Sequence, residues 1–532
     1  MEKGDGVPTY YMVDSKGMPQ HGQELVGKIS TLGANAGTLQ NLESNGEIIL
    51  IPTPTNDPND PLNWSRPFKW YLTCLVCFAA FMSNLTTAGP SIAILQTSAT
   101  FGTLPPKTAY LYSCAALMQG ASMFWWSPLV SKFGKRPIYV LTYLLYLATC
   151  LGAGACKTWS SQLGVRIILG AASGAGEMLG PLTISDMWYV HERTTPMAAY
   201  QAFLSVGVAF GMIIDGAIVT SYTWRHIYWV SSALIGALCV LVIFTFPETS
   251  FRRPALANVT ISQQRHIDMS QKKTLVQNLK LFHGIRTNES FLKLFLRPWA
   301  ALLLPAVAWA ALTFSATIGF IVAVTSNVAL AFGQTYGFNA QKVGLCFFAG
   351  LIGSVLGIWL GGVLPDFISH RAVVRNRGLR EPEMKLPSIV PAIIAAPLSL
   401  VLYGAGIHFS WHWIVPTIGL GLLNFTVVAG TNVAMMYAVD CYKPITEEVV
   451  TAILGYKAFF GFLLSFYTNS WVTLEGYLKA YSEMAAISGA IILLALPMYI
   501  WGKRMRQASL NWTVFKVIQW NDDRDDLVLE TE

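Results

Sequence analysis

The chain has 532 residues, of which 53% are hydrophobic and 12% are charged, and its formal net charge at pH 7 is +7. Soluble domains carry about 25% charged residues, so this composition excludes a globular protein dissolved in water. The basic excess is dispersed over many short segments, with no basic helix or group of zinc ligands beside it. That distribution excludes a nucleic-acid partner and indicates contact with the anionic face of a lipid bilayer.

Twelve apolar stretches of about 20 residues follow one another, and each is long enough to cross the ~30 Å hydrocarbon core of a bilayer as a helix. We predict spans at 69–92, 108–130, 138–156, 162–184, 196–220, 227–247, 299–327, 341–364, 388–406, 411–438, 448–471 and 482–502. A long basic segment at 248–298 separates two sets of six. The sequence therefore predicts an all-α membrane protein whose twelve transmembrane helices form two six-helix bundles.

The basic residues also predict how the chain is oriented. Of the 36 Lys and Arg, 29 lie in the tails and the gaps of one alternating set, counting Lys69 at the edge of the first span, and only four lie in the other gaps. Because basic loops remain in the cytosol, both termini are expected there, in a multi-pass protein of the plasma membrane. The expected divisions are a cytosolic tail at 1–66, an N-terminal bundle at 67–247, a cytosolic linker at 248–298, a C-terminal bundle at 299–502 and a cytosolic tail at 503–532.

Two ionisable residues share the predicted fourth span, and ionisable residues inside a span are functional candidates because they are costly to place there. Arg166 and Glu177 are eleven residues apart, about three helical turns, so both project from nearly the same face. Glu177 lies near the middle of the span among Ala and Gly. A carboxyl group in such surroundings suits the uptake and release of a proton; a static buried ion pair is the alternative.

Four further candidates are polar residues inside predicted spans. Asp215 falls in the outer half of span 5, where an ion pair with Arg166 would be either structural or opened by a substrate or proton. Lys457 in span 11 can repel or exchange with a cationic substrate, pair with a carboxylate, or extend to the cytosolic surface. Asn84 and Asn424 predict either substrate contacts or hydrogen bonds between helices.

Short basic loops occupy corresponding positions in the two halves, after spans 2 and 8. Charges at these ends of the spans can join the halves in one state and release them in another, as alternating access requires. The candidate gating residues of these loops are Gly134, Lys135, Arg136, Gly362, Asp366 and Arg371. In span 5, Gly207, Gly211 and Gly216 permit close helix contact, which serves either rocking at a seam or simple packing.

Several of these segments resemble motifs of the major facilitator superfamily. Phe133-Gly-Lys-Arg-Pro137 is similar to its loop 2–3 motif, although Gly and Asp usually stand where this chain has Ser127 and Ser131. Arg166-Ile-Ile-Leu-Gly170 resembles the span-4 motif whose Arg is linked to proton coupling. The run 207–216 resembles the antiporter motif of span 5, with Asp215 at a place where Gly is usual. Asp186 and the lead-in 57–65 resemble the fungal twelve-span drug:proton antiporters.

The resemblance implies a function as well as a fold. It implies a monomeric, proton-coupled secondary transporter that exports a small organic molecule, a toxic compound or a secondary metabolite, with no cofactor or metal. Uptake of a polyamine or another organic cation is the alternative, and a non-transporting membrane sensor is a third reading. No HExxH-type metal motif appears in the sequence, so an enzyme is not expected.

Overall fold

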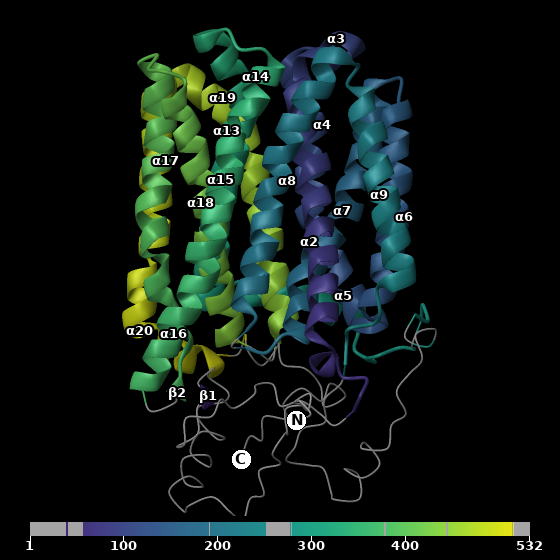
Figure 1. The fold of residues 1–532 in the computed structure, drawn as a ribbon, viewed down its shortest axis with the longest axis vertical. Helices are drawn as coiled ribbons and strands as arrows, with labels where there is room; N and C mark the ends of the chain where they lie inside the picture. The colour runs from purple at the N-terminus through teal and green to yellow at the C-terminus, as the bar shows by residue number, and fades with distance from the viewer. Residues whose placement is uncertain are drawn as a thin grey trace, which may run out of the picture.

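The computed structural model describes residues 39–40, 57–190, 192–251, 277, 279–282, 284–376, 379–442, 445–512 and 514. Most of both predicted tails, and 252–276 of the predicted linker, lie outside these described residues. The described chain forms a tall array of helices that run along the long axis of the molecule (Figure 1). We call the end where α5, α16 and α20 lie the lower end, and the end where α3 and α14 lie the upper end.

The first half of the chain supplies six rods. A short 3₁₀ helix, η2 (Pro61–Asn63), precedes them. Their elements are α2 (Arg66–Ala88) continued by η3 (Gly89–Ala93) and α3 (Ile94–Phe101), α4 (Pro105–Ala121) with α5 (Met123–Phe133), α6 (Lys135–Ala155), α7 (Trp159–Met187), α8 (Thr194–Ser221) and α9 (Arg225–Thr245).

The second half repeats this arrangement after a helix at the lower end, α12 (Phe291–Ala301). Its first rod is α13 (Pro305–Tyr336). The second joins α14 (Ala340–Cys346), α15 (Phe348–Ile358), η5 (Trp359–Val363) and α16 (Leu364–Arg375), and the third joins η6 (Pro382–Ile389) and α17 (Val390–His408). The remaining helices are α18 (Ile414–Cys441), α19 (Thr446–Leu493) and α20 (Ala495–Leu510). Two short strands, β1 (Leu39–Gln40) and β2 (Leu379–Arg380), pair antiparallel at the lower end, with Leu39 opposite Arg380.

Ten helical segments in the described ranges are long and apolar enough to cross a bilayer. The last of them, Thr446–Ser509, breaks at Gly476, whose φ of 80° lies outside the helical region, so it supplies two crossings. The α4–α5 rod supplies one more, between α3 and α6. These twelve crossings confirm the expected all-α membrane fold.

One helix begins later than the sequence predicted. α13 starts at Pro305, whereas its span was expected from residue 299. Proline lacks the backbone N–H that the first helical turn leaves unpaired and is therefore favoured at that position. The residues before it belong to α12 and the turn that follows.

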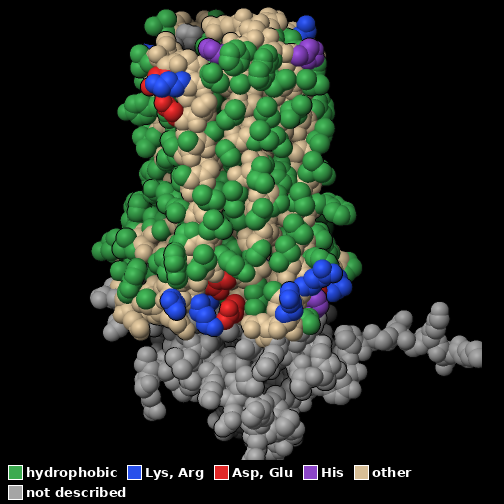
Figure 2. Space-filling model, turned by 90° about the vertical axis from the view of Figure 1, so that its left-hand side faces the viewer, with side chains coloured by type: hydrophobic (Ala, Val, Ile, Leu, Met, Phe, Trp, Pro, Cys, Tyr) green, Lys and Arg blue, Asp and Glu red, His purple; other side chains and the backbone are tan. Residues whose placement is uncertain are grey.

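The surface has the polarity of a membrane protein. On the face drawn in Figure 2, hydrophobic side chains cover the middle of the molecule, and most of the visible Lys and Arg lie at its lower end. Large apolar side chains of a candidate span, Ala340–Arg375, are strongly exposed, such as Trp359 at 71% and Ile352 at 65%. Such a band would be a poor surface in water and is suited to lipid.

Glycines bring α4 and α7 unusually close. A Cβ atom added at Gly170 would lie within 3.0 Å of the backbone oxygen of Ala115, and one at Gly174 equally close to that of Gln119. Larger residues would push these helices apart. Because Glu177 follows Gly174 by one turn, this packing carries its carboxylate to the side chain of Gln119.

Candidate functional site

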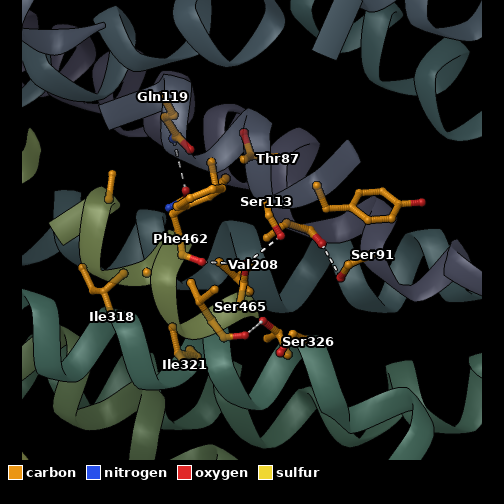
Figure 3. A pocket seen from close by; sticks show the side chains of 18 of the residues that line it. Thr87, Ser91, Ser113, Gln119, Val208, Ile318, Ile321, Ser326, Phe462 and Ser465 are labelled. Atoms are coloured by element: carbon orange, nitrogen blue, oxygen red, sulfur yellow. Dashed lines mark hydrogen bonds between the residues drawn. The ribbon is translucent and has the colours of Figure 1, made fainter. Parts of the chain in front are cut away.

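A cavity of about 150 Å³ lies between the two bundles at mid-depth. Its walls come from both halves of the chain (Figure 3). The first half contributes residues of the rods that contain α2, α4, α7 and α8, and the second half contributes residues of α13 and α19. Its polar lining consists of Asn84, Thr87, Ser91, Tyr112, Ser113, Gln119, Glu177, Thr325, Ser326, Lys457, Ser465 and Asn469. Its apolar lining includes Ile94, Ile318, Ile321, Val322 and Phe462.

The cavity holds an ion pair that joins the two bundles. The Nζ of Lys457 on α19 donates to Oε1 of Glu177 on α7. The other carboxylate oxygen accepts a 2.7 Å hydrogen bond from Nε2 of Gln119 on α4. The two charged side chains are nearly buried, with exposed fractions of 8% for Lys457 and 1% for Glu177. Each carboxylate oxygen therefore has a donor, and the charge of Glu177 is balanced by the facing bundle.

Polar groups around this pair connect it to neighbouring helices. Gln119 Nε2 also donates to Oγ of Ser83 at 2.8 Å, and Tyr200 donates to the backbone oxygen of Glu177 at 2.6 Å. Asn84 lines the cavity and donates to the backbone oxygen of Leu204 at 3.1 Å. Asn84 is thus placed for both of the roles that the sequence left open.

Above the pair, towards the upper end, further contacts join α4 to α19. Ser465 on α19 donates to Ser113 on α4 at 2.6 Å, and the rings of Tyr110 and Phe466 lie 4.8 Å apart. The lining residues of α19 run upward from Lys457 to Asn469. The cavity therefore extends from the ion pair towards the upper end, where α4 meets α19 and Gly216 of α8 lies against the backbone of Ala340.

The structure does not pair Arg166 with Asp215. Arg166 is fully buried, donates to the backbone oxygens of Leu111 (3.2 Å) and Thr86 (2.9 Å), and lies over the ring of Tyr112 at 4.7 Å. Asp215 is 1% exposed, and its Oδ2 has no hydrogen-bond partner in the described chain. Both residues lie outside the cavity wall, on its upper side.

Other candidates of the sequence lie at helix seams. Asn424 accepts from Ser205 at 2.7 Å, a hydrogen bond between α18 and α8, and does not line the cavity. Gly207 and Gly211 of α8 lie against the backbone of α2 and η3, and Gly216 lies against that of Ala340. Each of these glycines allows two helices to pack closely. The contact between the helices is therefore free of large side chains at these positions.

The first basic loop ties the lower ends of α6, α7 and α9 together. Lys135 forms an ion pair with Asp186. The backbone N–H groups of Lys135 and Arg136 donate to the carboxylate of Glu248 at 3.2 and 3.1 Å, across the turn at Gly134, whose φ is 91°. A side chain at Gly134 would be strained by this φ and would collide with Glu248. This loop therefore stiffens its own bundle.

The two bundles are joined at the lower end by a buried cluster of charges. Arg193 of the first half forms an ion pair with Asp440 of the second, and Lys385 lies 2.9 Å from the other oxygen of Asp440. Lys385 also donates to Thr194 at 3.2 Å. Burial of all three charged groups makes the contact sensitive to the loss of any one of them.

The second basic loop lies beside this cluster. Gly362 faces Ala198 of the first half, where an added Cβ would lie 2.8 Å from the Cβ of Ala198. Asp366 lies close enough to Lys385 and Arg380 to interact with both charges. Arg371 lies over the ring of Phe367 on its own helix at 4.3 Å and is exposed. Gly362 and Asp366 therefore belong to the contact between halves, and Arg371 does not.

Three features of the site were not anticipated from the sequence. The first is the hydrogen bond from Gln119 to Glu177. The second is the cluster of Arg193, Asp440 and Lys385. The third is the pair of hydrogen bonds from Ser127 and Ser131 to Glu447 of the other half, at 3.2 and 2.7 Å. The sequence did hold one signal for Gln119, because an amide side chain inside an apolar span is expected to hydrogen-bond to another polar group. Within the described ranges, no three His, Cys, Asp or Glu side chains gather as metal ligands.

Comparison with known proteins agrees with this architecture. The family model described as Major Facilitator Superfamily matches residues 74–444, more than half of the chain. An uncharacterised MFS-type transporter of Schizosaccharomyces pombe is 25% identical, with 89% of this chain and 90% of the relative covered. The efflux pump radE of Floropilus chiversii is 22% identical, with 94% and 93% covered. The solved proton:xylose symporter XylE has a TM-score of 0.55 at 14% identity, over 82% of this chain and 96% of that one, which shows the fold.

Proposed function

Because the chain belongs to the major facilitator superfamily, we propose that it is a proton-coupled secondary transporter that exports a small organic molecule by alternating access. The family makes it a transporter in a lipid bilayer rather than an enzyme. Export of a toxic compound or secondary metabolite is supported by relatives such as the efflux pump radE. Proton coupling is supported by the residues of the cavity.

The observation that carries this proposal is the Glu177–Lys457 ion pair, which is buried in the cavity and connects the bundles. A bound cargo changes the charge and hydrogen bonding of this pair, and so does the gain or loss of a proton. Because the partner of Glu177 belongs to the other bundle, either event also alters the contact between the bundles. The Glu177–Lys457 pair thus couples proton binding, cargo binding and rocking, the three elements that a secondary transporter requires.

We assign the lower end to the cytosol, because the basic loops lie there, and place the protein in the plasma membrane as a monomer. The Arg193–Asp440–Lys385 cluster and the hydrogen bonds to Glu447 close this end. The cavity extends in the opposite direction, which supports release of the cargo at the upper end. Inward opening then requires the lower contacts to part.

The remaining candidates receive supporting roles in this scheme. Arg166 and Asp215 are buried ionisable groups on the upper side of the cavity, where they can respond to protons that enter from outside. Gly207, Gly211 and Gly216 form the seams along which α8 can shift. Asn84 contacts cargo in the cavity.

The test is flux in proteoliposomes that contain the purified full-length protein and an imposed pH gradient. An acid exterior should drive the export of a transported compound, and Glu177→Gln should abolish this pH-driven flux. That variant leaves the buried charge of Lys457 without its partner, which can destabilise the protein. The double variant Glu177→Gln/Lys457→Met removes both charges and is therefore the second variant to test.

Glu475→Gln, next to the break of α19 at Gly476 and outside the cavity lining, is the matched control and should transport normally. Undiminished pH-driven flux in both Glu177 variants would overturn the assignment. Inward movement of spermidine with the gradient would favour polyamine uptake instead, and a wild-type protein without any flux would favour the sensor reading.

A further inference from the structure

Lys457 already pairs with Glu177, the one carboxylate among the described residues that line the cavity. Among the lining residues, the ionisable side chains are Glu177, Lys457 and Tyr112. The other charged residues of α7 are Arg166, which lies over the ring of Tyr112, and Asp186, which pairs with Lys135 at the lower end. The remaining helices that face the pair present amides and hydroxyls, from Asn84, Gln119 and Tyr200. The charge of the lining is therefore balanced while the pair is intact.

We propose that Lys457 is a tethered cation that exchanges with the cargo at Glu177, and that the cargo is an organic ammonium or another organic cation. This inference rests on the proposed proton-coupled export and adds its substrate class and its proton carrier. A cation that approaches Oε1 of Glu177 meets the ammonium of Lys457 at the same atom. Two unit charges about 4 Å apart at an effective dielectric constant of about 20 disfavour joint occupancy by roughly three orders of magnitude.

The exchange is balanced in charge and atoms. When the cavity faces the cytosol, the cargo cation takes the place of the ammonium at Glu177. One N–H bond of Lys457 breaks, the electron pair stays on Nζ, and the proton passes to cytosolic water. When the cavity faces outward, a proton from outside binds Nζ, the ammonium returns to Glu177, and the cargo leaves. One cation moves out for each proton that moves in, which is the stoichiometry an acid exterior can drive.

The walls of the cavity favour this substrate class. Hydroxyl and amide oxygens of Thr87, Ser91, Ser326 and Asn469 surround the space above the pair, and Phe462 adds an aromatic face. These groups suit a cation. An anion would instead pair with Lys457 after Glu177 had taken up a proton, so cargo and proton would travel in the same direction, which opposes export.

Binding to the purified full-length protein separates these cases. Tetraethylammonium is the first probe, because it has no proton of its own to exchange, and spermidine and benzoate complete the panel. Calorimetry in two buffers of different ionisation enthalpy counts the protons released. We expect the wild type to release about one proton for each tetraethylammonium bound.

Two substitutions of Lys457 make opposite predictions. Lys457→Arg keeps a permanent cation at Glu177, since Arg does not lose its proton in proteins; it should bind tetraethylammonium at least ~10-fold more weakly and release no proton. Lys457→Gln removes the competitor and should bind the probe more tightly, again without proton release. Lys479→Gln makes the same chemical change in an exposed ion pair of the same helix, 64% exposed, and should match the wild type.

The outcomes separate the two proposals. Proton release and pH-driven flux of wild-type magnitude in Lys457→Arg would overturn the role of Lys457 and leave proton-coupled export standing. Benzoate binding with proton uptake, or no binding of either cation, would overturn the substrate class. A wild-type protein without pH-driven flux of any probe would overturn the proposed function itself.

Discussion

Ser131 of the first half donates a 2.7 Å hydrogen bond to Oε1 of Glu447 in the second half. Ser127, one turn earlier on α5, donates to the same oxygen at 3.2 Å. The resembling loop motif has Asp where this chain has Ser131, so a carboxylate is usual on that side. Here the carboxylate belongs to α19 and two hydroxyls face it. The contact depends on a neutral donor at position 131.

Ser131→Asp should therefore weaken the contact between the halves at the lower end. A hydrogen bond to a charged group contributes about 1.5–3 kcal/mol, and the new carboxylate would also repel Glu447. Labelling of a cysteine placed near Glu447, from the lower side, should increase. Ser131→Asn retains a donor and should label as the wild type does; equal labelling of the Asp variant would contradict the expectation.

Asp440→Asn should cost more stability than Arg193→Gln. The first variant leaves two buried cations, Arg193 and Lys385, without their carboxylate, and breaking a buried pair costs about 3–5 kcal/mol. The second leaves Asp440 with Lys385 at 2.9 Å. Thermal unfolding in detergent measures both variants. A lower midpoint for Arg193→Gln than for Asp440→Asn would show that Lys385 does not compensate.

Gly174→Ala should destabilise the packing of α4 on α7 by about 1–3 kcal/mol, because the added methyl group has no room beside the backbone of Gln119. It should also reduce transport, since Gln119 bonds to Glu177. Gly164→Ala is the control on the same helix, because a Cβ there meets nothing within 4 Å. Equal midpoints of thermal unfolding for the two variants would refute the steric argument.

The attachment of α12 should weaken in acid. Burial by itself raises the pKa of Glu289, but the hydrogen bonds and charges of Arg297 and Lys293 outweigh it and hold this pKa below its usual value. A group with a lowered folded-state pKa contributes stability above its unfolded pKa, about 4.3 for Glu, and loses that contribution as the pH falls through the folded-state pKa.

Hydrogen exchange of residues 289–301, corrected for intrinsic rates, should therefore rise as the pH is lowered through this range. The variant Glu289→Gln should show faster exchange at neutral pH and little further change in acid. A wild-type protein whose exchange in this segment is independent of pH would show that the ion pair does not hold α12.

The sequence by itself determined the class of fold and the family. Apolar stretches of membrane-spanning length, basic residues in alternate gaps and the motif around Gly134 each depend on local composition, which the chain carries without reference to its tertiary structure. The same local reasoning identified Glu177 and Lys457 as costly residues inside spans, and therefore as candidates.

Only the tertiary structure decided which candidates meet. Glu177 and Lys457 are 280 residues apart, and no periodicity within one helix indicates which face another helix presents to it. The described chain contains no ion pair between Arg166 and Asp215: Arg166 donates through Nε and Nη1 to backbone oxygens and lies over Tyr112, while its Nη2 and Oδ2 of Asp215 have no hydrogen-bond partner there. Likewise, Ser131 became a contact of Glu447 only when α5 packed beside α19. Which distant charged residues form ion pairs depends on how the helices pack against one another, and this packing depends on the whole chain.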